Sequence, residues 1–309
     1  MTIIEAIPNI SEGRQRHVIE KIVDEIHNLP NCRLLHYSSD VSHNRTVLTL
    51  VGSPSGLTKA ILRLYEKAIQ LIDLREHYGE HPRFGVVDVV PFVPIQKAST
   101  SDCIKLARKL GQLVSKQFKI PIYLYEAAST RIKNRALEDI RREQIKGTSD
   151  QTEKQSYGPD FGPDSPHPTA GISAIGAREP LIAFNVNLKT GDLQIAKQIA
   201  KKIRTRNGGL PNVKAIGIRI ANRKMVQVSI NLTNHEQTPL YLVFDTVKEE
   251  AERRGVKIAE SEIVGLAPTL ALVTTAAQYL NLSTFKPEQI LESQLCTQFS
   301  LPRNELRTE

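Results

Sequence analysis

The sequence predicts an α/β protein made of two similar halves, each with the element order βαββαβ that is typical of ferredoxin-like units. Short β-branched runs alternate with longer amphipathic runs, and a polar, Pro/Gly-rich stretch separates the halves. The pairs Ser53-Pro54 and Thr238-Pro239 stand at the same place in each half, where a hydroxyl cap followed by proline suits the start of a helix. We therefore expect two subdomains, residues 1–178 and 179–309, with a linker over about residues 146–178 and a ligand site between them.

Each expected element follows from local periodicity. Strands of the first half are expected where short runs are apolar and β-branched, at residues 3–8, 32–37, 45–51, 86–93 and 120–125. Its helices are expected where apolar residues recur with a period near 3.6, at residues 11–26, 54–72 and 101–116. The same criteria place strands of the second half at 181–188, 213–220, 225–232 and 256–264, and helices at 193–203, about 238–254, and 269–279.

Composition narrows the class of protein. The chain has 309 residues of which 40% are hydrophobic, so a sizeable core can form. No apolar run approaches the roughly 20 residues that a membrane span needs, and the N-terminus lacks the basic region of a signal peptide. Cys32, Cys103 and Cys296 are too far apart for a disulfide framework or a metal knuckle, which favours a reducing compartment. We expect a cytoplasmic enzyme that does not associate with membranes.

The net charge of +8 and the pI near 9.3 suit anionic partners, although a well-solvated basic surface explains them equally. One rival interpretation is therefore a basic ferredoxin-like RNA-binding protein. Such proteins present aromatic pairs on the sheet, whereas Phe184 and Tyr241 are isolated in this sequence. We expect no nucleic-acid partner.

The densest group of polar residues is Gly79-Glu80-His81-Pro82-Arg83, preceded by His77. His77 to His81 matches the zinc-peptidase pattern H-x-x-E-H, which requires a continuous helix. Gly79 and Pro82 both disfavour that helix, so no metal is expected. Alternatively His81 is a loop histidine suited to proton transfer near neutral pH, with Glu80 orienting the ring and Arg83 binding a carboxylate. Spacing alone also allows a solvated loop histidine.

Two other polar segments follow strands. The segment Asp40–Arg45 either contacts ligand or forms a hairpin turn, and Asn9–Gly13 either binds an anion at a helix N-terminus or only caps the helix. The sequence has no phosphate loop, no G-x-G-x-x-G fingerprint and no G-x-S-x-G elbow.

Taken in order, several motifs of this sequence resemble the formiminotransferase family over about residues 3 to 282. The motifs that carry the resemblance are Pro8-Asn9-Ile10-Ser11-Glu12-Gly13, His43-Asn44-Arg45-Thr46-Val47, Gly79-Glu80-His81-Pro82-Arg83 continuing to Pro94, Pro159-Asp160-Phe161-Gly162-Pro163, Gly176-Ala177-Arg178, Leu181 to Leu188, Gln227-Val228-Ser229 and Val264-Gly265-Leu266. Several long motifs in the same order are more specific than any one of them.

The resemblance implies transfer of a formimino group from N-formimino-L-glutamate to N5 of tetrahydrofolate, between two α/β subdomains of a homodimer. It implies that His81 is the catalytic acid and base, and that tetrahydrofolate is a co-substrate. The family's folate-binding stretches fall on Gly162, Pro163, Asp164, Ser165, His167, Pro168 and Gly171, and on Val213, Lys214, Ile216 and Gly217.

Further residues are expected to assist. Because both substrates carry carboxylates, Arg45, Arg83, Arg178 and Lys214 are candidate anion-binding groups. Glu80 and Asp40 are candidate supporting groups, and Asn9, Ser11 and Asn44 are candidate ligand-binding groups.

The resemblance leaves the donor open. Formyl transfer between 5-formyltetrahydrofolate and glutamate needs the same histidine, and a folate-binding protein without transfer activity is a further alternative. The chain ends at Glu309 with no room for the cyclodeaminase domain of some relatives, so its product is expected to pass to a separate protein.

Overall fold

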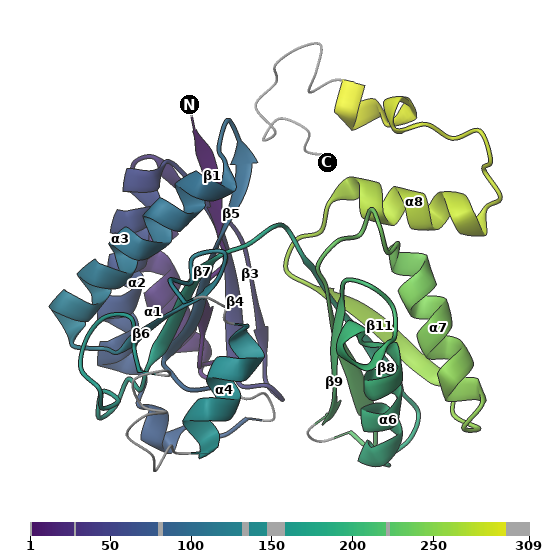
Figure 1. The fold of residues 1–309 in the computed structure, drawn as a ribbon, viewed down its shortest axis with the longest axis horizontal. Helices are drawn as coiled ribbons and strands as arrows, with labels where there is room; N and C mark the ends of the chain where they lie inside the picture. The colour runs from purple at the N-terminus through teal and green to yellow at the C-terminus, as the bar shows by residue number, and fades with distance from the viewer. Residues whose placement is uncertain are drawn as a thin grey trace.

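The computed structural model describes residues 2–27, 29–79, 83–131, 136–146, 158–220 and 223–294. Its two β-sheets confirm the predicted α/β fold with two subdomains (Figure 1). The first sheet consists of β1 (Ile3–Ala6), β2 (Asn9–Ile10), β3 (Cys32–Asp40), β4 (Arg45–Gly52), β5 (Val87–Gln96), β6 (Ile122–Glu126) and β7 (Ser173–Ala177). Both β1 and β2 lie between β4 and β5, and the full order is β3, β4, β1 with β2, β5, β7, β6.

Three helices cover one face of this sheet: α1 (Arg16–His27), α2 (Pro54–Leu71) and α3 (Thr100–Phe118). The Ser53 hydroxyl accepts from the Gly56 N–H at 3.1 Å, so the predicted cap of α2 is present. The prediction that this helix begins at Ser11 was wrong, because α1 begins five residues later, at Arg16. Before it, Asn9–Ile10 form β2, and the Glu12 carboxylate accepts the N–H groups of Arg14 and Gln15.

The first half exceeds the predicted βαββαβ unit. After α3, β6 lies at the sheet edge, and β7 inserts between β5 and β6, parallel to both. The sequence did not predict β7, which falls inside the expected linker. Its residues Ser173–Ala177 are all buried and, apart from Ile175, small, so the strand depends on tertiary pairing more than on local β-propensity. Helix α4 (Leu137–Lys146) precedes it in the chain.

The second half forms the predicted unit with every element in place. Its sheet has the order β11 (Ile258–Val264), β8 (Ile182–Leu188), β10 (Val226–Leu232), β9 (Val213–Arg219), and all pairs are antiparallel. Helices α6 (Leu193–Ile203) and α7 (Leu240–Glu252) pack on one face around Val243, Val247 and Ile199. The expected cap at Thr238 was wrong: α7 has no side-chain cap, and the Thr238 hydroxyl donates to Pro211 O at 2.7 Å.

The two sheets face each other, with their helices mostly on the outer sides (Figure 1). Helix α4 is an exception, since it packs through Ile140 and Leu137 against Tyr123 and Val89. The facing surfaces are therefore the open faces of β3 and β4 on one side and of β8, β10 and β11 on the other. This arrangement creates a space between the subdomains that neither half has alone.

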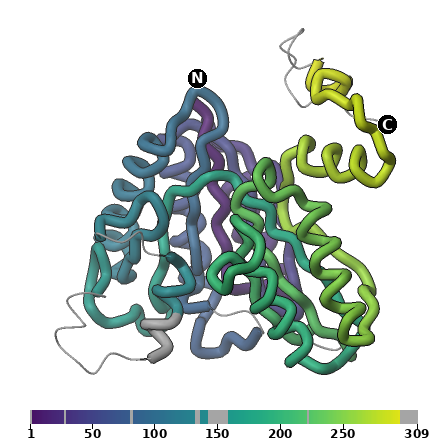
Figure 2. The backbone as a smooth tube through the Cα atoms, turned by 45° about the vertical axis from the view of Figure 1, so that its right-hand side comes forward, coloured from purple at the N-terminus to yellow at the C-terminus, as the bar shows by residue number. Residues whose placement is uncertain are grey.

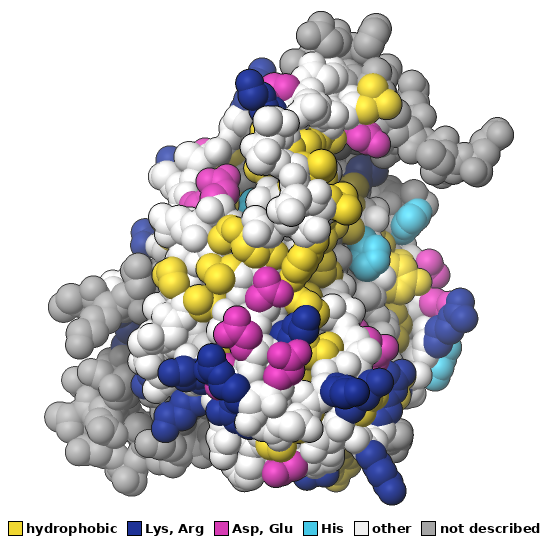
Figure 3. Space-filling model, turned by 90° about the vertical axis from the view of Figure 1, so that its right-hand side faces the viewer, with side chains coloured by type: hydrophobic (Ala, Val, Ile, Leu, Met, Phe, Trp, Pro, Cys, Tyr) yellow, Lys and Arg dark blue, Asp and Glu magenta, His cyan; other side chains and the backbone are white. Residues whose placement is uncertain are grey.

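The last described segment projects away from both sheets. Helix α8 (Thr269–Tyr279) buries only Ala271, and the chain after it leads outward, as Figures 1 and 2 agree. Large apolar side chains stay exposed here: Leu266, Leu272, Tyr279, Leu280, Leu282 and Leu291. Hydrophobic side chains form a band across this side of the molecule (Figure 3). Within the described ranges, no helix is both long and apolar enough to cross a membrane.

Candidate functional site

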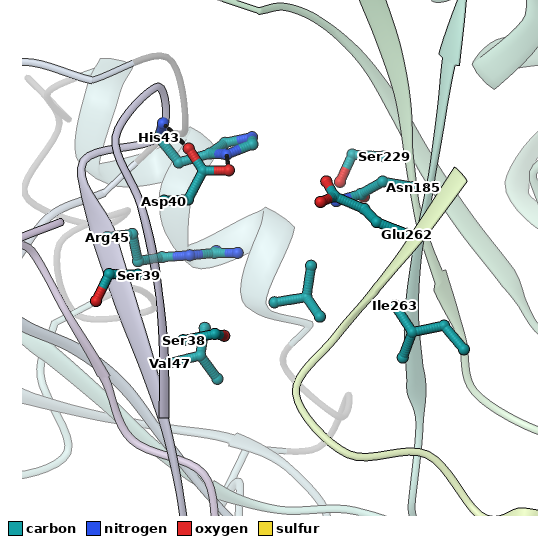
Figure 4. Close-up of a pocket in the computed structure, with 11 residues that line it drawn as sticks. Ser38, Ser39, Asp40, His43, Arg45, Val47, Asn185, Ser229, Glu262 and Ile263 are labelled. Atoms are coloured by element: carbon teal, nitrogen blue, oxygen red, sulfur yellow. Dashed lines mark hydrogen bonds and ion pairs between the residues drawn. The ribbon is translucent and has the colours of Figure 1, made fainter. Parts of the chain in front are cut away.

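A polar pocket lies between the open faces of the two sheets (Figure 4). One wall comes from β3, β4 and their turn, and the other from β8, β10 and β11. The lining residues are Ser38, Ser39, Asp40, His43, Arg45 and Val47 on the first wall, and Asn185, Ser229, Glu262, Ile263 and Val264 on the second. The empty space between the walls is about 510 Å³, a volume that includes the open mouth of the pocket.

Asp40 and His43 form a fixed pair at the turn between β3 and β4. The His43 N–H donates to Asp40 Oδ1 at 2.7 Å, and His43 Nδ1 lies 2.8 Å from Asp40 Oδ2. Burial, the largest single effect, raises the pKa of Asp40, but the hydrogen bonds from His43 together outweigh it and leave that pKa below its ordinary value. Asp40 is thus an anion that orients His43, which is 6% exposed.

Replacing Asp40 by asparagine is expected to lower the free energy of unfolding at pH 7 by up to about 1 kcal/mol, because the Asp40 side chain is 42% exposed and water screens its charge. A carboxylate whose pKa is lowered by folding stabilises the protein above its unfolded pKa of about 3.9, and that contribution disappears as pH falls through the folded value. Urea unfolding of both proteins at pH 7 and pH 3 checks this. An equal difference at both pH values would contradict it.

Arg45 supplies a positive charge to the same wall. Its side chain points toward the second wall (Figure 4). Burial and the charge of Arg141 lower the pKa of Arg45, the carboxylates of Asp88 and Asp40 oppose them, and the net pKa is about 10. Arg45 is therefore a cation at neutral pH, held partly out of water where it interacts strongly with an anion.

Behind Arg45, Asp88 and Arg141 form a buried ion pair. Asp88 Oδ2 lies 2.6 Å from Arg141 Nη2, and Asp88 Oδ1 accepts from the Phe84 N–H at 2.8 Å. The Arg141 guanidinium also lies 5.5 Å from the centre of the Phe84 ring. This pair ties α4 to β5 and to the chain just after His81.

The second wall is a row of polar residues that pair across three strands. Glu262 on β11 lies opposite Asn185 on β8, which lies opposite Ser229 on β10. Glu262 Oε1 accepts from Asn185 Nδ2 at 3.0 Å and from Gln227 Nε2 at 3.1 Å. The first wall thus presents a cation and the second an anion, so the pocket suits a ligand that carries both charges.

Glu80, His81 and Pro82 lie outside the described residues, but their neighbours on both sides fix where that segment starts and ends. Gly79 packs against the His43 carbonyl so closely that a β-carbon would overlap it. Arg83 Nη1 donates to Gly79 O at 3.0 Å, and Arg83 Nη2 donates to His77 O. Gly79 and Arg83, which flank these three residues in the sequence, therefore lie near the turn that carries His43.

His77 lies beside the β3–β4 turn, since its Nε2 lies 2.8 Å from Asn44 O. Burial lowers the pKa of His77, with a smaller effect of the same sign from Arg83, so the ring is neutral near pH 7. Throughout the described part of the chain, no group of three or more His, Cys, Asp or Glu side chains is placed to hold a metal ion.

Asn9, Ser11 and Asn44, predicted to bind ligand, are buried and bonded to main chain. Asn9 Nδ2 donates to Ile7 O at 2.9 Å, and the Ser11 hydroxyl donates to Gly85 O at 2.7 Å. Asn44 Oδ1 accepts from the Gly13 N–H at 2.9 Å, while its Nδ2 donates to Tyr78 O at 3.0 Å. In this structure these three side chains join the loops around the pocket.

The predicted folate loop runs from β6, where Phe161 pairs with Ile122, to Gly171, which pairs with Gly85. Gly162, Pro163, Asp164 and Ser165 are exposed, as is Pro168, and Gly162 abuts Ser115 at the end of α3. His167 and Gly171 close a tight loop by exchanging backbone hydrogen bonds of 2.9 and 3.0 Å. Gly171 has φ +69° and touches Phe84 O, so the structure brings this end of the loop next to the segment that follows His81.

The predicted residues of β9 divide between the two faces of the sheet. Val213 lies in the helix-covered core and Gly217 abuts α6, whereas Ile216 pairs with Ser229 on the pocket face. Lys214 Nζ lies 2.9 Å from Glu126 Oε1 and 3.4 Å from Glu138 Oε2, which joins the two subdomains. Burial alone would lower the pKa of Lys214, but its bonds to the two carboxylates raise it overall.

Arg178, another predicted anion-binding group, lies at the far end of the first sheet. Its backbone N–H donates to Phe92 O, and its Nη1 donates to Glu179 O at 2.9 Å. Burial lowers the pKa of Arg178, and the nearby Tyr125 and Glu5 oppose that effect. It does not line the pocket of Arg45.

Sequence reasoning missed most of the second wall. Asn185, Ser229 and Glu262 were not predicted as site residues, although two of them lie in motifs that carry the resemblance. A usable signal existed in β8 and β10, where polar residues recur at every second position in strands that are otherwise apolar. Such alternation predicts a polar sheet face, and only the packing of two sheets makes that face a pocket wall.

The fold and the pocket define an α/β protein with a pocket between two subdomains that presents groups of both charges. The family model described as the formiminotransferase domain, N-terminal subdomain, matches residues 3–178, and that of the formiminotransferase domain matches residues 183–295. The chain belongs to the formiminotransferase family.

Similar proteins of known name agree. The chain is 44% identical to glutamate formimidoyltransferase of Streptococcus pyogenes, over 95% of this chain and 98% of the relative. It is 42% identical to glutamate formimidoyltransferase of Thermoplasma acidophilum, over 96% and 98%. It is 37% identical to formimidoyltransferase-cyclodeaminase of Rattus norvegicus, where the match covers 90% of this chain but 52% of that protein.

Proposed function

We propose that this protein is a glutamate formimidoyltransferase, which moves the formimino group of N-formimino-L-glutamate to N5 of tetrahydrofolate. The observation that carries the proposal is the match of both subdomains to the family, together with 44% identity to a relative of that name over nearly its whole length. The pocket between the subdomains supports it, because N-formimino-L-glutamate carries two carboxylates and a basic amidine.

The reaction requires two proton transfers. N5 of tetrahydrofolate attacks the amidine carbon, the C=N π pair moves onto nitrogen, and N5 gives up its proton. The bond from carbon to the glutamate nitrogen then breaks with its electron pair on that nitrogen, which takes a proton while C=N re-forms. One imidazole can accept the first proton and deliver the second, so we assign both steps to His81.

Other groups position the reactants. Arg45 is placed to bind a carboxylate of the donor at the first wall, and Asp40 keeps His43 oriented beside it. Ser38 Oγ lines the same pocket and is buried with no hydrogen-bond partner among the described residues. A buried polar atom of this kind is explained by a ligand that supplies its partner.

The test is an assay of purified protein with tetrahydrofolate, comparing N-formimino-L-glutamate and N-formyl-L-glutamate as donors. Product is measured by absorbance after acid converts it to the methenyl derivative. We expect turnover with the formimino donor, and an Arg45→Met variant with KM for that donor raised about 10-fold or more through loss of a charged hydrogen bond. Exposed Arg63→Met is the control. No turnover with either donor would overturn the proposal.

The proposal extends to the setting of the reaction. Following the family resemblance, we place the protein in the cytoplasm as a homodimer whose product is a substrate for a cyclodeaminase. The exposed apolar side chains of α8 and the segment after it support association with a second copy. Light scattering at several protein concentrations tests the dimer.

A further inference from the structure

Glu262 presents a carboxylate to the pocket in a fixed orientation. Its Oε1 accepts hydrogen bonds from Asn185 and Gln227, both 5% exposed or less. No described residue donates to Oε2, and Glu262 lines the pocket opposite Arg45 and His43 (Figure 4). Two buried amides therefore hold one oxygen of a carboxylate whose other oxygen faces the ligand space.

We propose that Glu262 recognises the positively charged amidine of the donor and so selects a formimino donor over a formyl donor. This inference rests on the proposed function and deepens it. The formimino group of N-formimino-L-glutamate is a strong base that is protonated near neutral pH, with its charge spread over two planar N–H-bearing nitrogens. The formyl group of N-formyl-L-glutamate is neutral and presents a carbonyl oxygen in the same position.

The formimino and formyl donors differ in charge and in hydrogen-bonding capacity where they would meet the Glu262 carboxylate. A planar cation with two donor nitrogens matches a carboxylate in the way that a guanidinium does. The formyl oxygen is an acceptor, so it gains nothing from the carboxylate and is repelled by its charge. With Arg45 on the other wall, the donor's carboxylate and its amidine meet opposite charges on opposite sides of the pocket.

Asn185 and Gln227 are positioning residues for Glu262, because both donate to its Oε1. Gln227 Nε2 also donates to Asn187 Oδ1 at 2.9 Å, which fixes the direction of its amide. The polar row next to the pocket offers a matched control. Glu260 lies two residues from Glu262 on β11 and accepts a hydrogen bond from Asn187 Nδ2 at 3.1 Å. Unlike Glu262, it does not line the pocket, and its Oε1 also accepts from Arg223 Nη1 at 2.7 Å.

The experiment compares wild type, Glu262→Gln and Glu260→Gln. For each protein, kcat/KM is measured with both donors, and calorimetry gives Kd for both donors and for 5-formyltetrahydrofolate. In Glu262→Gln we expect kcat/KM and affinity for the formimino donor to fall about 10- to 100-fold, the worth of one charged hydrogen bond. Values for the formyl donor and for the folate should stay within about twofold, and Glu260→Gln should match wild type in all of them.

Other outcomes are equally decisive. An equal loss with both donors would overturn the inference, and weaker folate binding with unchanged preference between donors would reassign Glu262 to the pterin ring. If wild type turns over neither donor, the proposed function fails. The calorimetric comparison then still tests Glu262, because equal affinity of wild type for the two donors would refute selection by charge.

Discussion

Replacing His81 by alanine is expected to lower kcat for formimino transfer by about 10²- to 10⁴-fold, the usual contribution of a positioned acid and base. On either side of His81 in the sequence, Gly79 packs on the His43 carbonyl, and Arg83 donates to Gly79 O and His77 O. These contacts hold Gly79 and Arg83 beside the turn that carries His43.

Two measurements separate chemistry from structure in this variant. Added imidazole should restore part of kcat in His81→Ala if the missing group transfers protons. The fold should be unchanged, as judged by circular dichroism and by KM within a few-fold. His17→Ala, an exposed histidine on α1, is the control and should keep full activity. Full activity of His81→Ala would contradict the assignment.

Replacing Asp88 by alanine is expected to lower the free energy of unfolding by about 3–5 kcal/mol, the cost of removing one partner from a buried ion pair. Asp88 is 1% exposed and neutralises Arg141 at 2.6 Å. Its loss removes the carboxylate that offsets the nearby charges of Arg141 and Arg45, and also leaves the Phe84 N–H without its acceptor. Urea unfolding measures the change.

The control for Asp88 is an exposed ion pair. Glu20 bonds to Arg16 one turn away on α1, with side chains 47% and 89% exposed, so Glu20→Ala should cost no more than about 0.5 kcal/mol. The double variant Asp88→Leu with Arg141→Met should recover part of the loss, because it removes both charges together. If Asp88→Ala costs as little as Glu20→Ala, the pair contributes nothing through its burial.

Most elements of the fold were predictable because local periodicity and burial agree. In α1, Val18, Ile22 and Ile26 repeat with the helical period and are all buried. The second half follows its predicted order throughout, since each strand is β-branched and each helix amphipathic. Prediction from local sequence failed where a hydroxyl side chain could either cap a helix or bond to a distant carbonyl. Ser11 and Thr238 resemble helix caps, but their hydroxyls bond to distant carbonyls of Gly85 and Pro211 instead.

Strand β7 shows the opposite case, a strand that forms although its own sequence does not predict one. Apart from Ile175, Ser173–Ala177 has small residues with little β-propensity, yet it lies between β5 and β6 with every residue buried. It becomes a strand because its backbone pairs in parallel with β5 on one side and β6 on the other. Those partners are distant in the sequence, so no local pattern predicts the pairing.

The sequence by itself determined the α/β class, the two-part organisation, the family and the polar residues that point out of each strand. Only the tertiary structure decided which polar residues meet. Arg45 and Glu262 are 217 positions apart and belong to different sheets, and they line one pocket because two open faces pack toward each other. Local physical chemistry sets the direction of a side chain from its strand, whereas its partner across the pocket is set by long-range packing.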